Sequence, residues 1–413
     1  MQNDFEGSED LMLYDQFAFG SIIVSGQSTV AADAPADALT LVAGTNITIT
    51  TNASTDTVTI TCTASGLSGT GSTDNAVLRA DGTGGSTLQA SAIVIDDLYT
   101  SSPNATVNYV CVKPTGGTTN VGVAIVPKGT GAFSLAVPDG TSTGGNARGA
   151  SAVDLQTSRS AATQVASGTN SVSIGVLNTA SNVQAISIGY NNAVSGVDGI
   201  GIGYQNSVSS GDDSGAFGLR NTVNGYQNYA FGSNNTVSGT SDSFAFGSSC
   251  TSSGTFGATA TGYQSSATRY AMRAHAAGRF SVTGDVQQVE FQLRNKTTNA
   301  TPTTLFLDGS STRLTIPSGK ILTAKVLIQG AKSDGSAVAV YRRLITIKNV
   351  SGTTTLVNSQ TLATDYEDNA STDVAITADD TNDALQINVT GITGETWRWH
   401  AVVTVASELA YGT

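Results

Sequence analysis

A large apolar residue followed by glycine recurs at a regular interval in the middle of the chain, and a degenerate seventh copy is Thr261-Gly262. A period of about 14 residues does not suit helix-pair or leucine-rich repeats, which are longer. It predicts two short strands and two tight turns per repeat, which is a parallel β-roll or β-helix over residues 170–268. The apolar column comprises Ile174, Ile188, Ile202, Phe217, Phe231 and Phe246, and an Asn column soon after the glycines comprises Asn178, Asn192, Asn206, Asn221 and Asn235.

Each column has an expected role in this shaft. We expect the Ile/Phe column to point inward and form the shaft core. The glycines allow tight turns and close approach of neighbouring chains. Asn tolerates left-handed turn conformations and can stack as a ladder of amides. Cys250 occupies the Asn column, and we expect it to be a small buried side chain.

The flanking sequence also alternates between apolar and polar residues, as β-strands do. Residues 39–63 predict a hairpin, and short strands between Gly-rich turns continue this pattern, so residues 39–145 are expected to form small β-rich modules. Residues 1–38 are an expected attachment segment with a linker, and residues 146–169 are an expected connector, either lacing or a short helix. Residues 269–284 are a transition that is unusually basic, with Arg269, Arg273, Arg279 and His275.

Residues 285–413 differ from the repeat because their expected strands are longer. They predict about nine strands with polar turns, which suits a distal antiparallel β-sandwich or jelly roll. The fold class is therefore predicted to be all-β. Because one chain has few large apolar residues with which to bury a core, we expect an obligate oligomer.

Composition and charge narrow the function classes. Only 12% of residues are charged, and 19 basic against 31 acidic residues give a net charge of −12. No Lys/Arg cluster is visible in the sequence, so nucleic-acid binding is not expected. No apolar run could span a membrane as a helix, and the N-terminus lacks the basic segment of a secretory signal. Three cysteines, Cys62, Cys111 and Cys250, form neither a disulfide framework nor a metal motif.

Several segments resemble modules of bacteriophage and prophage tail fibres. The matching stretches are GTGSTDNAVLRADGTGGSTLQASAIVIDD at 69–97, the segment 127–175 that begins PKGTGAF, HAAGRFSVTGDVQQVEFQLRNKTTNATPTTLFLDG at 275–309, and WRWHAVVTV at 397–405. The repeat itself also resembles the heads of trimeric autotransporter adhesins. The resemblance implies an elongated homotrimer in the virion, as a tail appendage. Its N-terminus would bind a tail or baseplate protein, and its C-terminal domain would bind a host surface glycan or protein.

Three alternatives remain beside the tail fibre. The first is a tailspike-type enzyme that depolymerises surface glycans. The second is a head fibre mounted on the capsid. The third is a bacterial surface adhesin, which is disfavoured because the C-terminal stretch of the sequence lacks the long amphipathic strands of an outer-membrane anchor.

No catalytic, cofactor or metal residues are expected. The two histidines, His275 and His400, belong to no metal motif, and the chain has no nucleophile-elbow or phosphate-loop signature. Carboxylates that a glycan hydrolase could use fall in polar turns, where a solvated loop is the simpler interpretation. These carboxylates are Glu367, Asp368, Asp379, Asp380 and Asp383. Asp379, Asp380 and Asp383 could alternatively offer oxygen ligands to calcium.

Aromatic residues are the candidates for receptor binding in the distal domain. Trp397 and Trp399 lie two positions apart and so share one face of a strand. Core packing is the simpler interpretation, and a sugar-stacking platform is the functional one. Tyr341 and Tyr366 are weaker candidates. Receptor contacts are expected on distal loops such as 331–336 and 365–372.

Overall fold

The structure is a computed structural model that describes residues 19–63, 76–80, 88–99, 109–114, 120–209 and 211–411. Within these residues all regular secondary structure is β-strand, which confirms the all-β class. The chain divides into two compact units, Met1–Ile125 and Val126–Thr413, and each is described by itself. Residues 1–18 of the expected attachment segment lie outside the described residues.

The first unit contains small antiparallel sheets. β1 (Ser21–Ile22) pairs with β2 (Val30–Ala31), and β3 (Ile47–Asn52) pairs with β4 (Thr57–Cys62) as the predicted hairpin. Strands β5 (Ala76–Ala80), β6 (Leu88–Tyr99) and β7 (Tyr109–Pro114) form a third sheet. The alternation of apolar residues and threonine in the hairpin predicts that one apolar face is turned inward. Two residues of that face, Val58 and Ile60, are nevertheless 51% and 60% exposed.

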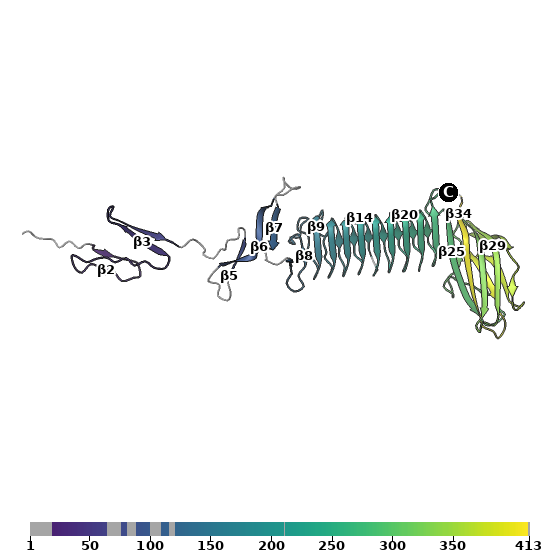
Figure 1. Cartoon of the computed structure of the whole chain (residues 1–413). Coiled ribbons are helices and arrows are strands. Elements are labelled where there is room, and N and C mark those ends of the chain that lie inside the picture. Colours follow the sequence, from purple (N-terminus) through teal and green to yellow (C-terminus); the bar gives the residue numbers. More distant parts are fainter. Residues whose placement is uncertain are drawn as a thin grey trace, which may run out of the picture. The chain divides into compact units, whose positions relative to one another are not determined.

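The second unit begins with a β-solenoid, as the repeat predicts. Its strands stack in sequence order with parallel pairing, one rung directly on the next (Figure 1). One side of each rung belongs to a long sheet made of β8 (Phe133–Ser134), β9 (Val153–Ser158), β10 (Val172–Val176), β12 (Ile186–Tyr190), β14 (Ile200–Tyr204), β16 (Gly215–Leu219), β18 (Tyr229–Ser233), β20 (Phe244–Ser248), β22 (Thr259–Tyr263) and β24 (Arg273–Ala277).

The other side of each rung belongs to a short sheet with very short strands. These are β11 (Thr179–Ala180), β13 (Ala193–Val194), β15 (Ser207–Val208), β17 (Thr222–Val223), β19 (Thr236–Val237), β21 (Thr251–Ser252) and β23 (Ser266–Ala267). In-register pairing aligns equivalent residues of successive rungs, for example Ile188 with Ile202 and Gly189 with Gly203. The period of the sequence repeat is therefore the length of one rung.

The solenoid extends beyond the expected range 170–268. β9 lies in the expected connector and pairs in parallel with β10, and β24 lies in the expected transition and pairs in parallel with β22. Both terminal rungs lack the Ile/Phe-Gly step that marks the repeat, which is why the sequence pattern did not reveal them. In β9 the buried Asp154 forms ion pairs with Arg148 at 2.6 Å and with Arg159 at 2.9 Å.

Glycine is required once per rung because the backbone there has a positive φ and neighbouring rungs are close. Gly189 has φ 120°, and a Cβ at this position would lie 2.1 Å from the carbonyl oxygen of Gly203. Any other residue would therefore both strain the backbone and push the next rung away.

The long sheet continues from the solenoid into the C-terminal part. β25 (Val286–Thr297) pairs antiparallel with β24, and β34 (Trp397–Ala410), β28 (Lys320–Lys332), β29 (Val338–Val350) and β30 (Thr353–Thr361) follow in that order, with β31 (Tyr366–Glu367) beside β29. A second antiparallel sheet contains β26 (Thr303–Thr304), β33 (Ala384–Thr390), β27 (Leu314–Thr315) and β32 (Asp373–Asp379).

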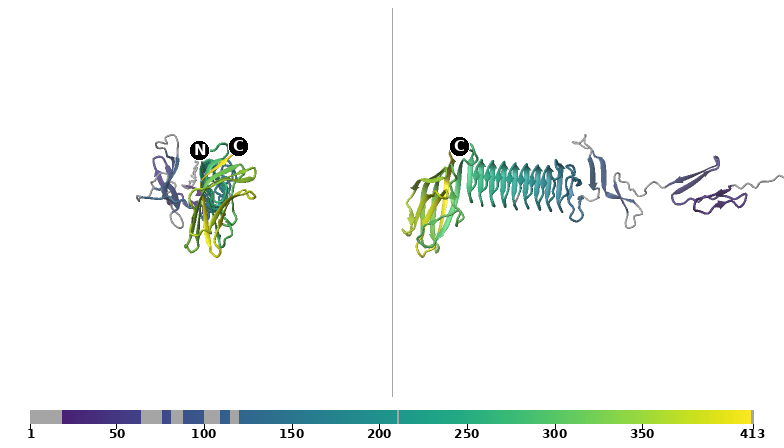
Figure 2. Two further views of the ribbon diagram at one scale, coloured as in Figure 1. Left: turned by 90° about the vertical axis from the view of Figure 1, so that its right-hand side faces the viewer. Right: turned by 180° about the vertical axis from the view of Figure 1, so that it is seen from behind.

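One hydrophobic cluster joins these C-terminal sheets. Ile328 of β28, Ile345 of β29 and Ile387 of β33 are all fully buried in it. Figure 2 shows the C-terminal strands side by side beyond the last rungs of the solenoid. β25 covers the edge of β24 that would otherwise be open for pairing.

Candidate self-association surface and distal residues

The outer face of the solenoid's long sheet is apolar. Successive residues of a strand point to opposite sides of the sheet. In β18, Ala230 points into the solenoid and is fully buried, so Tyr229 and Phe231 point outward. We name this outward side of β10, β12, β14, β16, β18, β20 and β22 the apolar face. Its middle column comprises Ile174, Ile188, Ile202, Phe217, Phe231, Phe246 and Thr261.

Within a single chain the Ile/Phe column does not point inward, because it lies on the outside of each rung; that it forms the core of a shaft made of several chains stays a prediction. Within one chain Ile202 is 37% exposed and Phe246 is 44% exposed. The space between the two sheets holds small side chains instead, because a rung this short encloses little volume. The fully buried inward residues of the two sheets include Ser173, Ser187, Ala216, Ala230, Ala245, Val194, Val208, Val223 and Val237.

Aromatic rings stack along the apolar face from rung to rung. Phe231 lies between Phe217 and Phe246, with ring centroids 4.8 and 4.9 Å apart and nearly parallel planes. Tyr190 and Tyr204 stack at 5.0 Å in a neighbouring column. No expectation covered this column, although Tyr190 and Tyr204 stand at the rung spacing and could have indicated it.

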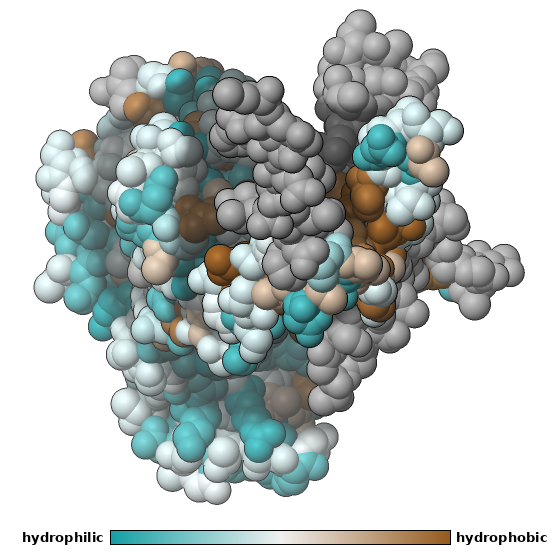
Figure 3. All heavy atoms as spheres, turned by 90° about the vertical axis from the view of Figure 1, so that its left-hand side faces the viewer, coloured by the Kyte–Doolittle hydropathy of each residue, from teal (hydrophilic) through white to brown (hydrophobic). Residues whose placement is uncertain are grey.

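The outer face of the short sheet has the opposite character. Its outward residues are mainly Ser and Thr, such as Ser207, Thr222, Thr236, Thr251 and Ser266. Figure 3 views the molecule end-on, where the described residues in sight are mainly hydrophilic and apolar residues form separate patches. The apolar face therefore distinguishes one side of the solenoid.

Buried asparagines link the rungs inside the solenoid. The Asn206 amide nitrogen donates to the carbonyls of Ile202 at 3.1 Å and Gly218 at 2.8 Å, and its Oδ1 accepts from the Asn221 backbone N–H at 3.0 Å. The expected left-handed conformation belongs to the preceding residue, since Gln205 has φ 55°. Cys250 is fully buried at the next Asn position after Asn235, as expected.

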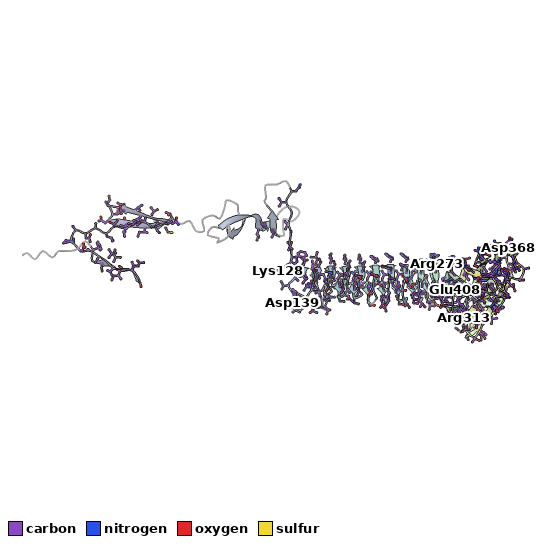
Figure 4. The ribbon with its side chains drawn as sticks, turned by 90° about the horizontal axis from the view of Figure 1, so that it is seen from below. Lys128, Asp139, Arg273, Arg313, Asp368 and Glu408 are labelled. Atoms are coloured by element: carbon purple, nitrogen blue, oxygen red, sulfur yellow. The ribbon has the colours of Figure 1, made fainter. Side chains whose placement is uncertain are left out.

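The apolar face ends where charged residues begin. Arg273 and His275 of β24 continue its columns, and Thr261 Oγ1 lies 3.0 Å from His275 Nδ1. Arg273 forms an ion pair with Glu290 of β25 at 3.7 Å, and a cavity of about 590 Å³ lies beside His275. Figure 4 labels Arg273 and Glu408 near this junction, with Asp368 further along.

Three of the four receptor candidates are core residues. Trp397, Trp399 and Tyr341 are at most 2% exposed, so the proposed role for them as a contact platform is wrong. The two tryptophans do share one face, with ring centroids 5.8 Å apart. The Trp399 indole N–H donates to Thr297 at 3.0 Å, and burial raises the pKa of Tyr341. Only Tyr366 is exposed, at 57%.

The candidate carboxylates hold turns in place. Asp368 accepts from the Val338 backbone N–H at 2.8 Å and from the Tyr366 hydroxyl at 2.8 Å. Asp383 accepts from the Thr354 hydroxyl at 2.8 Å, and Asp379 forms an ion pair with Arg313 at 3.1 Å. Each of these three groups is thus already engaged within the chain.

Metal-ligand clusters and membrane-spanning helices are both absent from the described ranges. No group of three or more His, Cys, Asp or Glu residues there could hold a metal ion. The same part of the chain contains no helix long and apolar enough to cross a membrane.

Comparison with known proteins identifies no family. No family model matches the chain, and no curated protein matches it. Among solved structures, the chain is similar to the tailspike protein of Acinetobacter phage vB_ApiP_P1, with 10% identity and a TM-score of 0.17 over 58% of this chain and 50% of that chain. The chain thus spans about half the length of that tailspike, and a TM-score this low carries no argument.

Proposed function

We propose that this chain is a structural and binding protein of a bacteriophage virion, a homotrimeric tail fibre. Three solenoids associate through their apolar faces, and the two C-terminal sheets form a β-sandwich that contacts the host surface. The N-terminal residues 1–38 attach the fibre to a tail or baseplate protein. The chain performs no catalysis in this role.

The contrast between the two outer faces of the solenoid supports this proposal best. A row of Ile, Phe and Tyr side chains facing water is unfavourable, since burial of each such side chain contributes about 1.5–3 kcal/mol. Contiguous exposed apolar surface of this kind marks interaction sites. Copies of one chain present identical rungs, so their faces match in length and spacing along the whole stack.

The resemblance of several segments to tail-fibre modules supports the virion part of the proposal. Those segments lie in three regions, namely the small sheets of the first unit, the start of the solenoid, and the strands β25 and β34. Three identical tips on each fibre, and several fibres on each particle, would convert weak individual contacts into strong attachment.

Immunogold labelling of virions tests the assignment. Antibodies raised against the intact chain should label tail appendages, and free chain should compete with virions for adsorption to host cells. Label on the capsid would make the protein a head fibre. Absence of label from all particles would contradict a virion protein.

A further inference from the structure

The outward side of the C-terminal part of the long sheet carries a cluster of five cations and one histidine. These side chains come from β25, β34, β28 and β29, which are separate in sequence and adjacent in the sheet. We name them the basic face. Its members are Arg294, Lys296, Arg398, His400, Lys325 and Arg342, and all six are exposed.

We propose that the basic face binds an acidic polysaccharide, a glycan chain that carries carboxylate or phosphate groups. This inference rests on the proposed function, in which the C-terminal sheets contact the host surface. It names the chemistry of the ligand and the surface that takes it.

Cross-strand pairing places two like charges directly opposite each other, because Lys296 lies opposite Arg398. On the same two strands, Arg294 lies opposite His400. Like-charged residues in such positions destabilise a sheet. The chain as a whole is acidic, with a net charge of −12, but here two positive charges repel each other and destabilise the sheet. An anionic ligand that bridges the two strands would turn this repulsion into attraction.

These cations also lack acidic partners. Among the described residues, the carboxylates that form ion pairs with arginine or lysine do so with other side chains, including Arg273, Lys332 and Arg343, and with none of the basic face. The nearby Asp308 is engaged by its own turn. Its carboxylate accepts hydrogen bonds from the backbone N–H groups of Ser310, Ser311 and Thr312.

The negative charge of Asp308 is therefore stabilised by hydrogen bonds within its own turn. Burial alone would raise the pKa of Asp308, but the three backbone N–H groups and the Thr312 hydroxyl outweigh burial and hold that pKa well below its usual range. The ordered turn in turn positions Arg294, whose guanidinium donates to the carbonyls of Leu307 at 3.1 Å and Asp308 at 2.8 Å. Arg294 is therefore held in place before any ligand binds.

A cavity of about 500 Å³ lies between this turn and the two strands, and its lining includes Arg294, Lys296, Arg398 and His400. Guanidinium groups bind carboxylate and phosphate oxygens through paired hydrogen bonds. The exposed amides of Gln292 and Gln329 lie on the same side of the sheet and can bond to sugar hydroxyls.

Nucleic acid fits this surface less well than a glycan. Proteins that bind single strands stack the bases on exposed aromatic rings. The tryptophan that borders the cavity, Trp399, is 2% exposed and packs into the core. The basic face therefore offers charges and amides without a stacking platform.

Binding of dextran derivatives to the intact chain tests this inference. The probes are carboxymethyl-dextran, phosphorylated dextran, uncharged dextran of the same length, and single-stranded DNA, each at low and at physiological salt. The wild type should bind at least one acidic dextran, more weakly at the higher salt, and should not bind the uncharged polymer. The double variant Lys296→Gln/Arg398→Gln should bind at least tenfold more weakly. Its thermal midpoint should stay equal or rise, since a pair of like charges has been removed.

A matched control separates the site from net charge. Lys128→Gln/Arg220→Gln removes two exposed cations outside the C-terminal strands and should bind as the wild type does. Equal weakening in the control, unchanged binding in the site variant, or DNA binding as tight as that of the acidic dextrans would each overturn the inference. If the protein labels virions but ignores both acidic dextrans, only this inference fails. If it binds them but is absent from virions, only the proposed function fails.

Discussion

Each buried asparagine of the solenoid satisfies several backbone groups at once, and the chain breaks this pattern at Cys250. The sulfur of Cys250 lies 3.3 Å from the Gly262 carbonyl oxygen, where an asparagine would place an amide nitrogen. We predict that Cys250→Asn raises the thermal midpoint, because the new amide can donate to the Phe246 and Gly262 carbonyls and accept from Ser265. Differential scanning calorimetry measures this.

The opposite substitution provides the control. Asn206→Ala leaves buried carbonyl and N–H groups without partners, and each such group costs about 1–3 kcal/mol. A lower midpoint for Cys250→Asn, or no loss in Asn206→Ala, would show that the amide ladder does not contribute to stability.

A second prediction at the residue scale concerns acid stability. Burial by itself would raise the pKa of Asp285. Its carboxylate accepts hydrogen bonds from three consecutive backbone N–H groups, those of Phe280, Ser281 and Val282. Together with the positive charge of Lys320, these bonds outweigh burial and lower the pKa of Asp285 to about 2.

A depressed pKa in the folded state stabilises the protein above the unfolded pKa of about 3.9, and this stabilisation is lost as the pH falls toward about 2. The free energy of unfolding should therefore decrease between about pH 4 and about pH 2. Asp285→Asn should show a smaller decrease over that interval when denaturant unfolding is followed at each pH. An identical decrease in the wild type and in Asp285→Asn would show that Asp285 does not contribute to acid sensitivity.

At the scale of elements, the sequence pattern predicted which residues of successive strands stack in one column, but not which side of the sheet each column faces. The repeat showed which residues stack, and the strands of residues 285–413 were recognisable from their alternation. Whether Ile174 or Ser173 faces the interior depends on the volume enclosed by one rung, which no single column reveals. Trp397 and Trp399 posed the same problem, since an aromatic pair on one face suits a core and a contact surface equally.

The basic face could not be recognised in the sequence, because it depends on which strands pair. Arg294 and Lys296 are distant from Arg398 and His400 along the chain, so no cluster appears when the sequence is read in order. Antiparallel pairing of β25 with β34 brings them together. The sequence offered one sign of this face, namely that basic residues stand two positions apart in each of the two expected strands.

Phe231 offers the sharpest test of the apolar face at this scale. We predict that Phe231→Asp raises the dissociation constant of the assembly at least a hundredfold, because three copies would each place a charge in an apolar interface. The interior of the rung should stay intact, since Ala230 points inward and is unchanged. Circular dichroism should therefore still report β-structure.

Thr236→Asp is the matched control, because Thr236 is exposed on the outer face of the short sheet. It adds the same charge to β19, the next strand along the chain, which belongs to the opposite sheet, and the assembly should be unaffected. Equal dissociation by both variants would place the interface elsewhere.

At the scale of the whole second unit, a buried ion pair joins the last rung to the C-terminal sheets. Arg269 follows β23 and pairs with Glu408 of β34, which also lies 3.5 Å from Lys320. Arg269 donates to the Thr315 carbonyl at 3.0 Å as well, and its guanidinium lies 4.6 Å from the ring centre of Phe291. The solenoid and the C-terminal sheets are thus connected by side chains in addition to the β24–β25 pairing.

A buried charge left without its partner typically destabilises a protein by about 3–5 kcal/mol. Because Glu408 keeps Lys320 at 3.5 Å, we predict a loss below this size for Arg269→Met in denaturant unfolding. The double variant Arg269→Met/Glu408→Gln should recover part of the loss, because the remaining side chain is neutral. A double variant less stable than Arg269→Met would contradict this prediction, because the unpaired charge of Glu408 would then not be the source of the loss.

Association of three chains through the apolar face is best tested by sedimentation equilibrium of the intact chain in dilute solution. We expect a mass of three times 41.8 kDa for the wild type, and smaller species for Phe231→Asp. A folded wild-type chain that sediments at 41.8 kDa across the concentration range would contradict it.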